Sequence, residues 1–180
     1  MPERVIRSLE RLGLSLATAE SLTGGLLAAA LTGVPGASKV FRGGVVAYQT
    51  PMKQVLAGVP EDVLREFGPV GGRTAVELAL GVRRVTGADW AVSTTGVAGP
   101  DTQAGHPVGE VWIGVSGRVE SAGAPFESAR RFDFTGTREQ IRAQSVAAAL
   151  DEIAAALGQR PRTVETSRNA AGRRQPGERE

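Results

Sequence analysis

The sequence predicts a three-layer α/β/α sandwich with a mixed sheet, formed by a single domain. Its 180 residues suit one domain of ordinary size. Short apolar runs alternate with segments of helical periodicity, which is typical of a sheet covered by helices on both faces. Two strand-like runs follow one another after residue 108 and are expected to pair, which favours a mixed sheet over a purely parallel one.

The individual elements follow from local patterns. Apolar residues at helical spacing over 5–12 predict a helix that stops at Gly13, and residues 14–19 form a short buried strand by pattern. The other predicted elements, in chain order, are helix 26–31, strand 43–48, helices 52–56, 60–67 and 74–85, strands 90–95, 108–115 and 127–134, and helix 137–157.

Positive charge gathers at the C-terminus. The isoelectric point is near 9.6 and the net charge is +2. Residues 159–180 hold six Arg and three Glu, so by subtraction residues 1–158 carry a net charge of −1. We predict a folded domain over 1–158 and a disordered Arg-rich tail over 159–180. The near-neutral body argues against nucleic acid as a partner, because such binding depends on clustered positive charge.

Composition excludes several kinds of chemistry. With no Cys the chain has no disulfide, thiolate nucleophile or thiolate zinc site, and with one His, His106, it has no two-His metal centre of its own. No apolar run approaches the ~20 residues of a membrane span, and the N-terminus lacks a signal-peptide pattern. We therefore expect a cytoplasmic protein without a membrane span.

Lysine usage marks one position for chemistry. Of 21 basic residues only Lys39 and Lys53 are lysines, so a retained lysine indicates a place where arginine fails. Arginine cannot release its proton, whereas a buried lysine can act as a base. The only tyrosine, Tyr48, stands five residues before Lys53 at the end of a predicted strand. The alternatives are two surface lysines left by chance and a tyrosine at the edge of the core.

Three further segments carry candidate polar groups. Ser21 lies between a strand and a helix, where it can be a nucleophile beside the N–H groups of Gly24 and Gly25, or simply the helix N-cap, as can Thr23. Residues 93–101 join hydroxyls and glycines that can cradle a phosphate or ribose, or form a structural turn. Arg138 and Arg142 are spaced to share one face of a helix, where their side chains can contact a phosphate or only solvent. We interpret His106 as a surface residue without a catalytic role.

Together these segments resemble the CinA C-terminal-domain family, which includes stand-alone nicotinamide-nucleotide amidohydrolases. The resemblance runs from about residue 4 to residue 157. It is carried by Thr-Ala-Glu-Ser-x-Thr-Gly-Gly at 18–25, Gly-Ala-Ser at 36–38, Gly-Gly-Val-Val-Ala-Tyr at 43–48, Ser-Thr-Thr-Gly-Val-Ala-Gly-Pro-Asp at 93–101, Pro-Val-Gly-Glu-Val-Trp at 107–112 and Gly-Thr-Arg-x-x-Ile-Arg at 136–142.

The resemblance implies hydrolysis of nicotinamide mononucleotide to nicotinate mononucleotide and ammonia, in pyridine nucleotide recycling. It implies a serine-lysine site that needs no metal or cofactor, made of Ser21 and Lys53, with Tyr48 assisting and Ser38 as a second candidate nucleophile. It also implies a homo-oligomer, a dimer or larger. The residues expected to bind substrate are Glu20, Thr23, Gly24, Gly25, Thr94, Thr95, Gly96, Ala98, Gly99, Asp101 and Arg142.

Three departures from the family pattern bear on substrate contacts more than on the reaction. The family commonly has Gly-Pro-Asp-Gly-Gly where this chain has Gly-Pro-Asp-Thr-Gln-Ala-Gly at 99–105; Val70 is followed by Gly71 instead of Ser, and Pro51 replaces a frequent Asn. A rival interpretation is a non-catalytic nucleotide-binding module linked to a competence or DNA-damage response. A second rival is nucleic-acid binding through the Arg-rich tail.

Overall fold

Five strands form one mixed sheet in the computed structural model, which describes residues 1–118 and 126–158. Strand β1 pairs in parallel with both β2 and β3, whereas β4 runs antiparallel to its neighbours β3 and β5. The predicted mixed sheet is therefore confirmed. The order across the sheet is β2 (Phe41–Val46), β1 (Leu16–Glu20), β3 (Trp90–Gly96), β4 (Glu110–Gly117), β5 (Phe126–Asp133). The predicted disordered tail lies outside the described residues.

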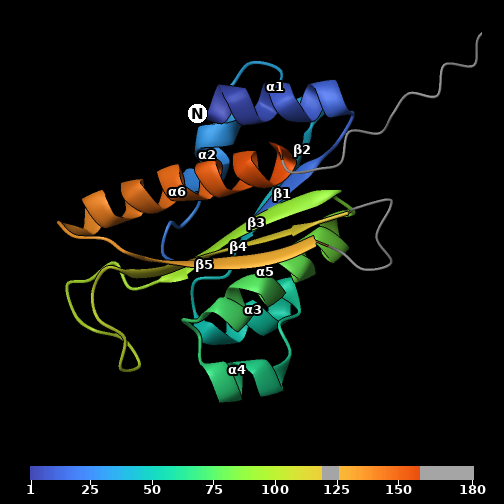
Figure 1. Cartoon of the computed structure of the whole chain (residues 1–180). Helices are drawn as coiled ribbons and strands as arrows, with labels where there is room; N and C mark the ends of the chain where they lie inside the picture. Colours follow the sequence, from blue (N-terminus) through green and yellow to red (C-terminus); the bar gives the residue numbers. More distant parts are fainter. Residues whose placement is uncertain (119–125, 159–180) are drawn as a thin grey trace, which may run out of the picture.

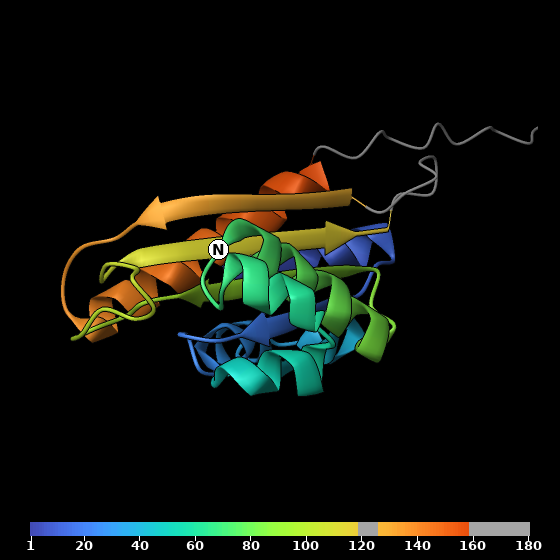
Figure 2. The ribbon, with the colours of Figure 1, turned by 90° about the horizontal axis from the view of Figure 1, so that it is seen from below.

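Within the described residues, six helices form the two outer layers (Figure 1). One face of the sheet is covered by α1 (Pro2–Leu12), α2 (Leu26–Thr32) and α6 (Arg138–Gly158). The other face is covered by α5 (Gly72–Thr86), on which α3 (Thr50–Ala57) and α4 (Glu61–Phe67) pack (Figure 2). A short 3-10 turn, η1 (Ala37–Lys39), precedes β2. The three-layer prediction is confirmed.

The helices within the described ranges include none long and apolar enough to span a membrane.

Each face of the sheet has its own apolar core. On the α1–α6 face, buried Trp90 and Ile113 from the sheet belong to one cluster with Ile6 and Ile153 from the helices. On the α5 face, small residues of β1 such as Ala17 and Ala19 pack with Leu78 of α5. Burial of each large aliphatic side chain contributes about 1.5–3 kcal/mol, so the two clusters hold both helical layers onto the strands.

Glycine at position 81 lets α3 lie directly on α5. A Cβ at Gly81 would stand 1.5 Å from the carbonyl oxygen of Ala57, a distance that no side chain can occupy. The close approach fixes the position of α3 relative to the sheet. Because α3 carries Lys53, it also fixes where the lysine side chain enters the core.

The ends of the parallel strands define the functional edge of the molecule. Strands β1, β2 and β3 end at Glu20, Val46 and Gly96, which lie at the same edge in the observed register. The chain leaves β1 for β2 on one side, and β3 lies on the other, so the strand order reverses at β1. Open α/β sheets bind their ligands at such a point.

Candidate active site

Ser21 and Lys53 meet at this edge. Ser21 directly follows β1, and Lys53 lies in the second turn of α3. The Nζ atom of Lys53 donates a hydrogen bond of 2.8 Å to Oγ of Ser21 and one of 3.2 Å to the carbonyl oxygen of Ala47. The two residues singled out from the sequence are thus in direct contact.

Lys53 is an unusually buried lysine. Only 2% of its surface is exposed, and Ser21 beside it is 8% exposed. Burial disfavours the charged ammonium and lowers the pKa of Lys53 from 10.5 to about 8. A lysine with such a pKa is neutral in an appreciable fraction of molecules near neutral pH, so it can accept a proton from the serine.

The turn that carries Ser21 is tied to β3. The Ser21 N–H donates to the carbonyl of Thr94 (2.9 Å), and the hydroxyls of Thr23 and Thr94 hydrogen-bond each other at 2.8 Å. The Thr95 hydroxyl donates to the carbonyl of Pro69. All these hydroxyls are buried, so Thr23, Thr94 and Thr95, expected to bind substrate, have partners inside the protein.

Glu20 caps helix α2 from inside. The residue is 1% exposed, and its carboxylate accepts hydrogen bonds from the N–H groups of Gly25 (2.9 Å), Leu27 (3.0 Å) and Ala28 (2.8 Å). Neither Ser21 nor Thr23 caps the helix, whose first flanking residue is Gly25. The interpretation of Ser21 or Thr23 as an N-cap is therefore wrong, because the Glu20 carboxylate occupies the donors that a cap would use.

The same contacts correct the expected oxyanion donors. The N–H of Gly25 is taken by Glu20, and the N–H of Gly24 donates to the carbonyl of Ser21 at 3.1 Å. Both groups that the sequence suggested are thus already bonded. Glu20 itself is a buried cap and not an exposed substrate ligand.

Tyr48 lies at the rim and not beside the lysine. The residue is 52% exposed, and its hydroxyl accepts a 2.6 Å hydrogen bond from Arg138. Arg138 also donates to the carbonyl of Gly99. Within the described residues no hydrogen bond joins Tyr48 to Ser21 or Lys53. Arg138, for which the sequence left open a phosphate or only solvent, thus links the strand end after β2 to the loop after β3.

Arg142 contacts the turn that follows Ser21 in its own chain. Its Nε donates to the carbonyl of Leu22 (3.0 Å) and its Nη2 to the carbonyl of Thr23 (2.8 Å). The side chain reaches this turn from the first part of α6. The sequence marked Arg142 as a substrate ligand but gave no sign of this backbone contact.

Ser38 lies at the opposite end of the strands. It is exposed in η1, just before β2 begins, and lines a cavity with Leu14, Ser15 and Asp89, which precede β1 and β3. A five-residue strand spans about 16 Å. The structure therefore does not bring Ser38 to Lys53, and of the two candidate serines it places only Ser21 there.

The end of β3 and the loop that follows it contain the remaining predicted ligands. Gly96, Ala98 and Gly99 are buried, whereas Asp101 is exposed. A Cβ at Gly99, whose φ is +86°, would stand 2.9 Å from the side chain of Val108, so the loop is tightly folded.

The loop is anchored to the start of β4. The buried carboxylate of Glu110 contacts Nδ1 of His106 (3.1 Å) and accepts a hydrogen bond from the indole of Trp112 (3.0 Å). His106, interpreted from the sequence as a surface residue, is half-buried in this contact.

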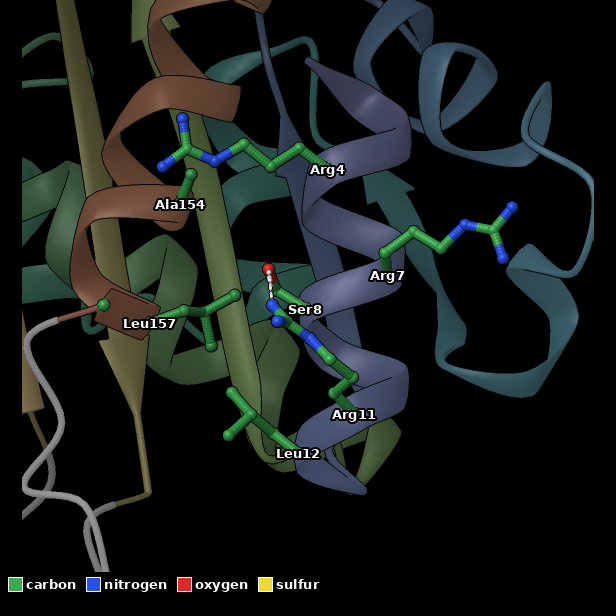
Figure 3. Close-up of a pocket in the computed structure, with 8 residues that line it drawn as sticks. Arg4, Arg7, Ser8, Arg11, Leu12, Ala154 and Leu157 are labelled. Carbon is green, nitrogen blue, oxygen red and sulfur yellow. Dashed lines mark hydrogen bonds between the residues drawn. The ribbon is translucent and has the colours of Figure 1, made fainter.

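A separate cavity lies between α1 and the end of α6 (Figure 3). Its volume is 760 Å³, and it is lined by Arg4, Arg7, Ser8 and Arg11 of α1 together with Leu157 and neighbouring residues of α6. None of the predicted site residues lines it. The chemistry suggested by the sequence is therefore not located in this cavity.

Fold and site together define a small three-layer α/β protein with a buried serine-lysine pair at the ends of its parallel strands. The family model of the CinA C-terminal domain matches residues 1–157, and the chain belongs to this family.

Relatives agree in sequence and in structure. A CinA-like protein of Frankia casuarinae is 45% identical over 85% of this chain, and a putative competence-damage inducible protein of Bacillus subtilis is 46% identical over 72%. The alignments span 34% and 30% of those two proteins, so the chain corresponds to about a third of their length.

Solved structures show the same fold. A CinA superfamily protein from Klebsiella pneumoniae superposes with a TM-score of 0.81 at 32% identity, covering 87% of this chain and 95% of that one. A competence/damage inducible protein from Agrobacterium tumefaciens gives a TM-score of 0.79 at 36% identity, covering 88% and 93%.

Proposed function

We propose that the protein is a serine-lysine amidohydrolase that deamidates nicotinamide mononucleotide. The observation that carries the reaction type is the buried contact of 2.8 Å between Lys53 and Ser21. The lowered pKa of Lys53 supports it, because a base must be neutral before it can take a proton. The substrate follows from the family resemblance of the motifs that surround this pair.

In the first step neutral Lys53 accepts the Ser21 hydroxyl proton. The carbonyl of Ala47 accepts one N–H of the amine, and Nζ lies 2.8 Å from Oγ of Ser21, within reach for the proton transfer. The Oγ atom bonds to the carboxamide carbon, and the C=O electron pair moves onto oxygen. When the C–N bond breaks, the Lys53 ammonium returns its proton to the leaving nitrogen and ammonia departs.

In the second step water cleaves the acyl-enzyme ester. Lys53, neutral again, takes a proton from the water as its oxygen bonds to the acyl carbon. The Ser21 oxygen leaves with the proton that Lys53 then returns. The products are nicotinate mononucleotide and free enzyme, so atoms and charges balance without a metal or cofactor.

Nucleotide binding is proposed for the rim of the site. Arg138 joins exposed Tyr48 to the carbonyl of Gly99, and Asp101 is exposed nearby in sequence. A guanidinium, a tyrosine ring and a glycine-rich loop together suit a phosphate, an aromatic ring and a ribose. The rim residues therefore fit a mononucleotide better than a simple amide.

The direct test is ammonia release from nicotinamide mononucleotide, with nicotinate mononucleotide measured in the same samples. We expect the two products in equal amounts from the wild type. The matched control is Ser38→Ala, which should keep full turnover because Ser38 lies at the far end of the strands. Equal loss in Ser38→Ala and Ser21→Ala would contradict our choice of nucleophile.

A second candidate function is a non-catalytic nucleotide-binding module in a competence or DNA-damage response. The names of relatives as putative competence-damage inducible proteins favour it. It predicts saturable binding of nicotinamide mononucleotide with no ammonia at any pH. The same assay, combined with calorimetric binding, therefore separates the two functions.

A further inference from the structure

We infer that the N–H groups of Leu22 and Thr23 form the oxyanion hole of this site, and that Arg142 is the positioning residue that holds their turn and directs the Thr23 N–H. The inference rests on the proposed hydrolytic function. The donors expected to stabilise the oxyanion, the N–H groups of Gly24 and Gly25, already donate to other acceptors.

The turn after β1 contains two N–H groups without an acceptor. Ser21, Gly24 and Gly25 all donate within the protein, to Thr94, Ser21 and Glu20. Among the described residues the N–H groups of Leu22 and Thr23 donate to no atom, although both residues are buried. Backbone N–H groups in buried segments are almost always paired. Two consecutive unpaired donors directly after the nucleophile therefore point to a bound negative oxygen.

Arg142 fixes the direction of one of these donors. In a planar trans peptide the C=O and the next N–H point in opposite directions. The Leu22 carbonyl is held toward Arg142 on α6, so the Thr23 N–H points away from α6. The Ser21 hydroxyl accepts its hydrogen bond from Lys53, whose helix α3 lies on the side of the sheet opposite α6. The Thr23 N–H therefore points away from Arg142.

The second donor is fixed by the turn itself. The Ser21 carbonyl accepts from the Gly24 N–H, so the Leu22 N–H, on the other side of the same peptide plane, points out of the turn. Gly24 makes this turn possible because its φ is +59°, and a Cβ there would stand 3.3 Å from Nη2 of Arg142. The turn and the guanidinium are therefore fitted to one another.

The chemistry needs donors of this kind. When Oγ of Ser21 bonds to the carboxamide carbon, the negative charge develops on an oxygen near the serine, and preorganised N–H groups stabilise it. A guanidinium suits the positioning role because its planar fork holds two carbonyls at once, whereas a lysine ammonium is a point donor. With Nε and Nη2 both bonded to the backbone, Arg142 is committed to the turn.

The test compares Arg142→Met and Arg142→Lys with the wild type on nicotinamide mononucleotide and on nicotinamide riboside, which lacks the phosphate. Loss of one oxyanion donor costs about 10²–10³ in kcat, so we expect kcat to fall by about that factor on both substrates in both variants. KM should change less than about threefold, and the pH midpoint set by Lys53 should stay in place. The control is Arg7→Met, an exposed arginine on α1 that should keep wild-type kinetics.

The opposite pattern would overturn the inference. If Arg142 binds the phosphate, its loss should raise KM for the mononucleotide and leave riboside turnover unchanged. Thermal unfolding identifies a variant that fails to fold, and guanidinium ions added to Arg142→Ala then supply a second test. Recovery of kcat with guanidinium but not ammonium supports the positioning role, and no recovery in folded protein contradicts it. Absence of ammonia from the wild type itself would overturn the underlying function instead.

Discussion

At the scale of single residues, the sequence predicts the Ser21–Lys53 pair but not its surroundings. The rarity of lysine among the basic residues singled out Lys53, and its position after a predicted strand singled out Ser21. Both signals can be recognised without knowledge of the fold. The role of Glu20 could not be predicted, since its carboxylate reaches N–H groups five to eight residues ahead through a turn whose path depends on the whole fold. The contact of Arg142 with Leu22 spans 120 residues and leaves no pattern in the sequence.

The pH dependence of turnover should report Lys53. Because the base must be neutral and its pKa is lowered to about 8, kcat/KM should rise with pH and level off above about 8. Stopped assays of ammonia release across pH 6–10 measure this midpoint, with each buffer checked for enzyme stability. A profile that is flat from about pH 6 upward would mean that Lys53 does not act as the base.

Burial of Lys53 should also lower the free energy of unfolding of the protein. Its folded pKa lies below its unfolded pKa of 10.5, so below pH 8 both states are protonated and the full burial penalty is present. As pH rises from about 8 to about 10.5 only the folded state loses the proton, and wild-type stability increases. We expect Lys53→Met to be more stable than the wild type by about 1–3 kcal/mol at pH 7, after losses from its two hydrogen bonds.

Urea unfolding at pH 7 and pH 10 checks this difference. The advantage of Lys53→Met should shrink at the higher pH. If Lys53→Met were less stable than the wild type at pH 7, or if its advantage grew with pH, burial of the charged ammonium would not be what lowers the stability of the wild type.

At the scale of elements, every predicted helix and strand in the described residues is present, with ends shifted by a few residues. Hydrophobic periodicity and terminal glycines were sufficient for this, as at Gly13, which ends α1. The predicted start of α2 at Leu26 is confirmed. Only the alternative of a hydroxyl cap at Ser21 or Thr23 was wrong, because the cap is the carboxylate of Glu20 at the end of the preceding strand. Such a cap joins β1 to α2 and holds Ser21 between them.

Removal of this cap should destabilise the region of the nucleophile. Glu20→Ala leaves three N–H groups at the start of α2 without their acceptor and should cost about 1–3 kcal/mol of unfolding free energy. Chemical denaturation measures the loss. The matched control is Glu3→Ala, whose exposed ion pair with Arg7 should change stability by less than about 0.5 kcal/mol. Equal effects in both variants would exclude a capping role.

At the scale of the whole molecule, composition and alternation predict three layers, but the order of the strands depends on long-range pairing. That order brings the ends of β1, β2 and β3 together and separates Ser38 from Lys53, which the linear sequence leaves open. Packing through glycine, as at Gly81, likewise depends on which helix lies opposite. The fold was thus more predictable than the contacts within the site.

Removal of residues 159–180 should leave catalysis intact. All proposed site residues lie between Glu20 and Arg142, and the positive charge of the chain is concentrated beyond residue 158. We expect unchanged kcat/KM for a chain that ends at residue 158, and loss of any salt-dependent DNA binding that the full chain shows. A large fall in turnover would mean that the tail contributes to the site.

The most direct test of the central claim compares the wild type, Lys53→Arg and Ser21→Ala in one assay of ammonia release from nicotinamide mononucleotide. Arginine keeps the positive charge but cannot serve as the base, and alanine removes the nucleophile. We predict release by the wild type and a loss of at least about 10³-fold in each folded variant. Wild-type rates in Lys53→Arg, or in Ser21→Ala, would contradict the serine-lysine mechanism.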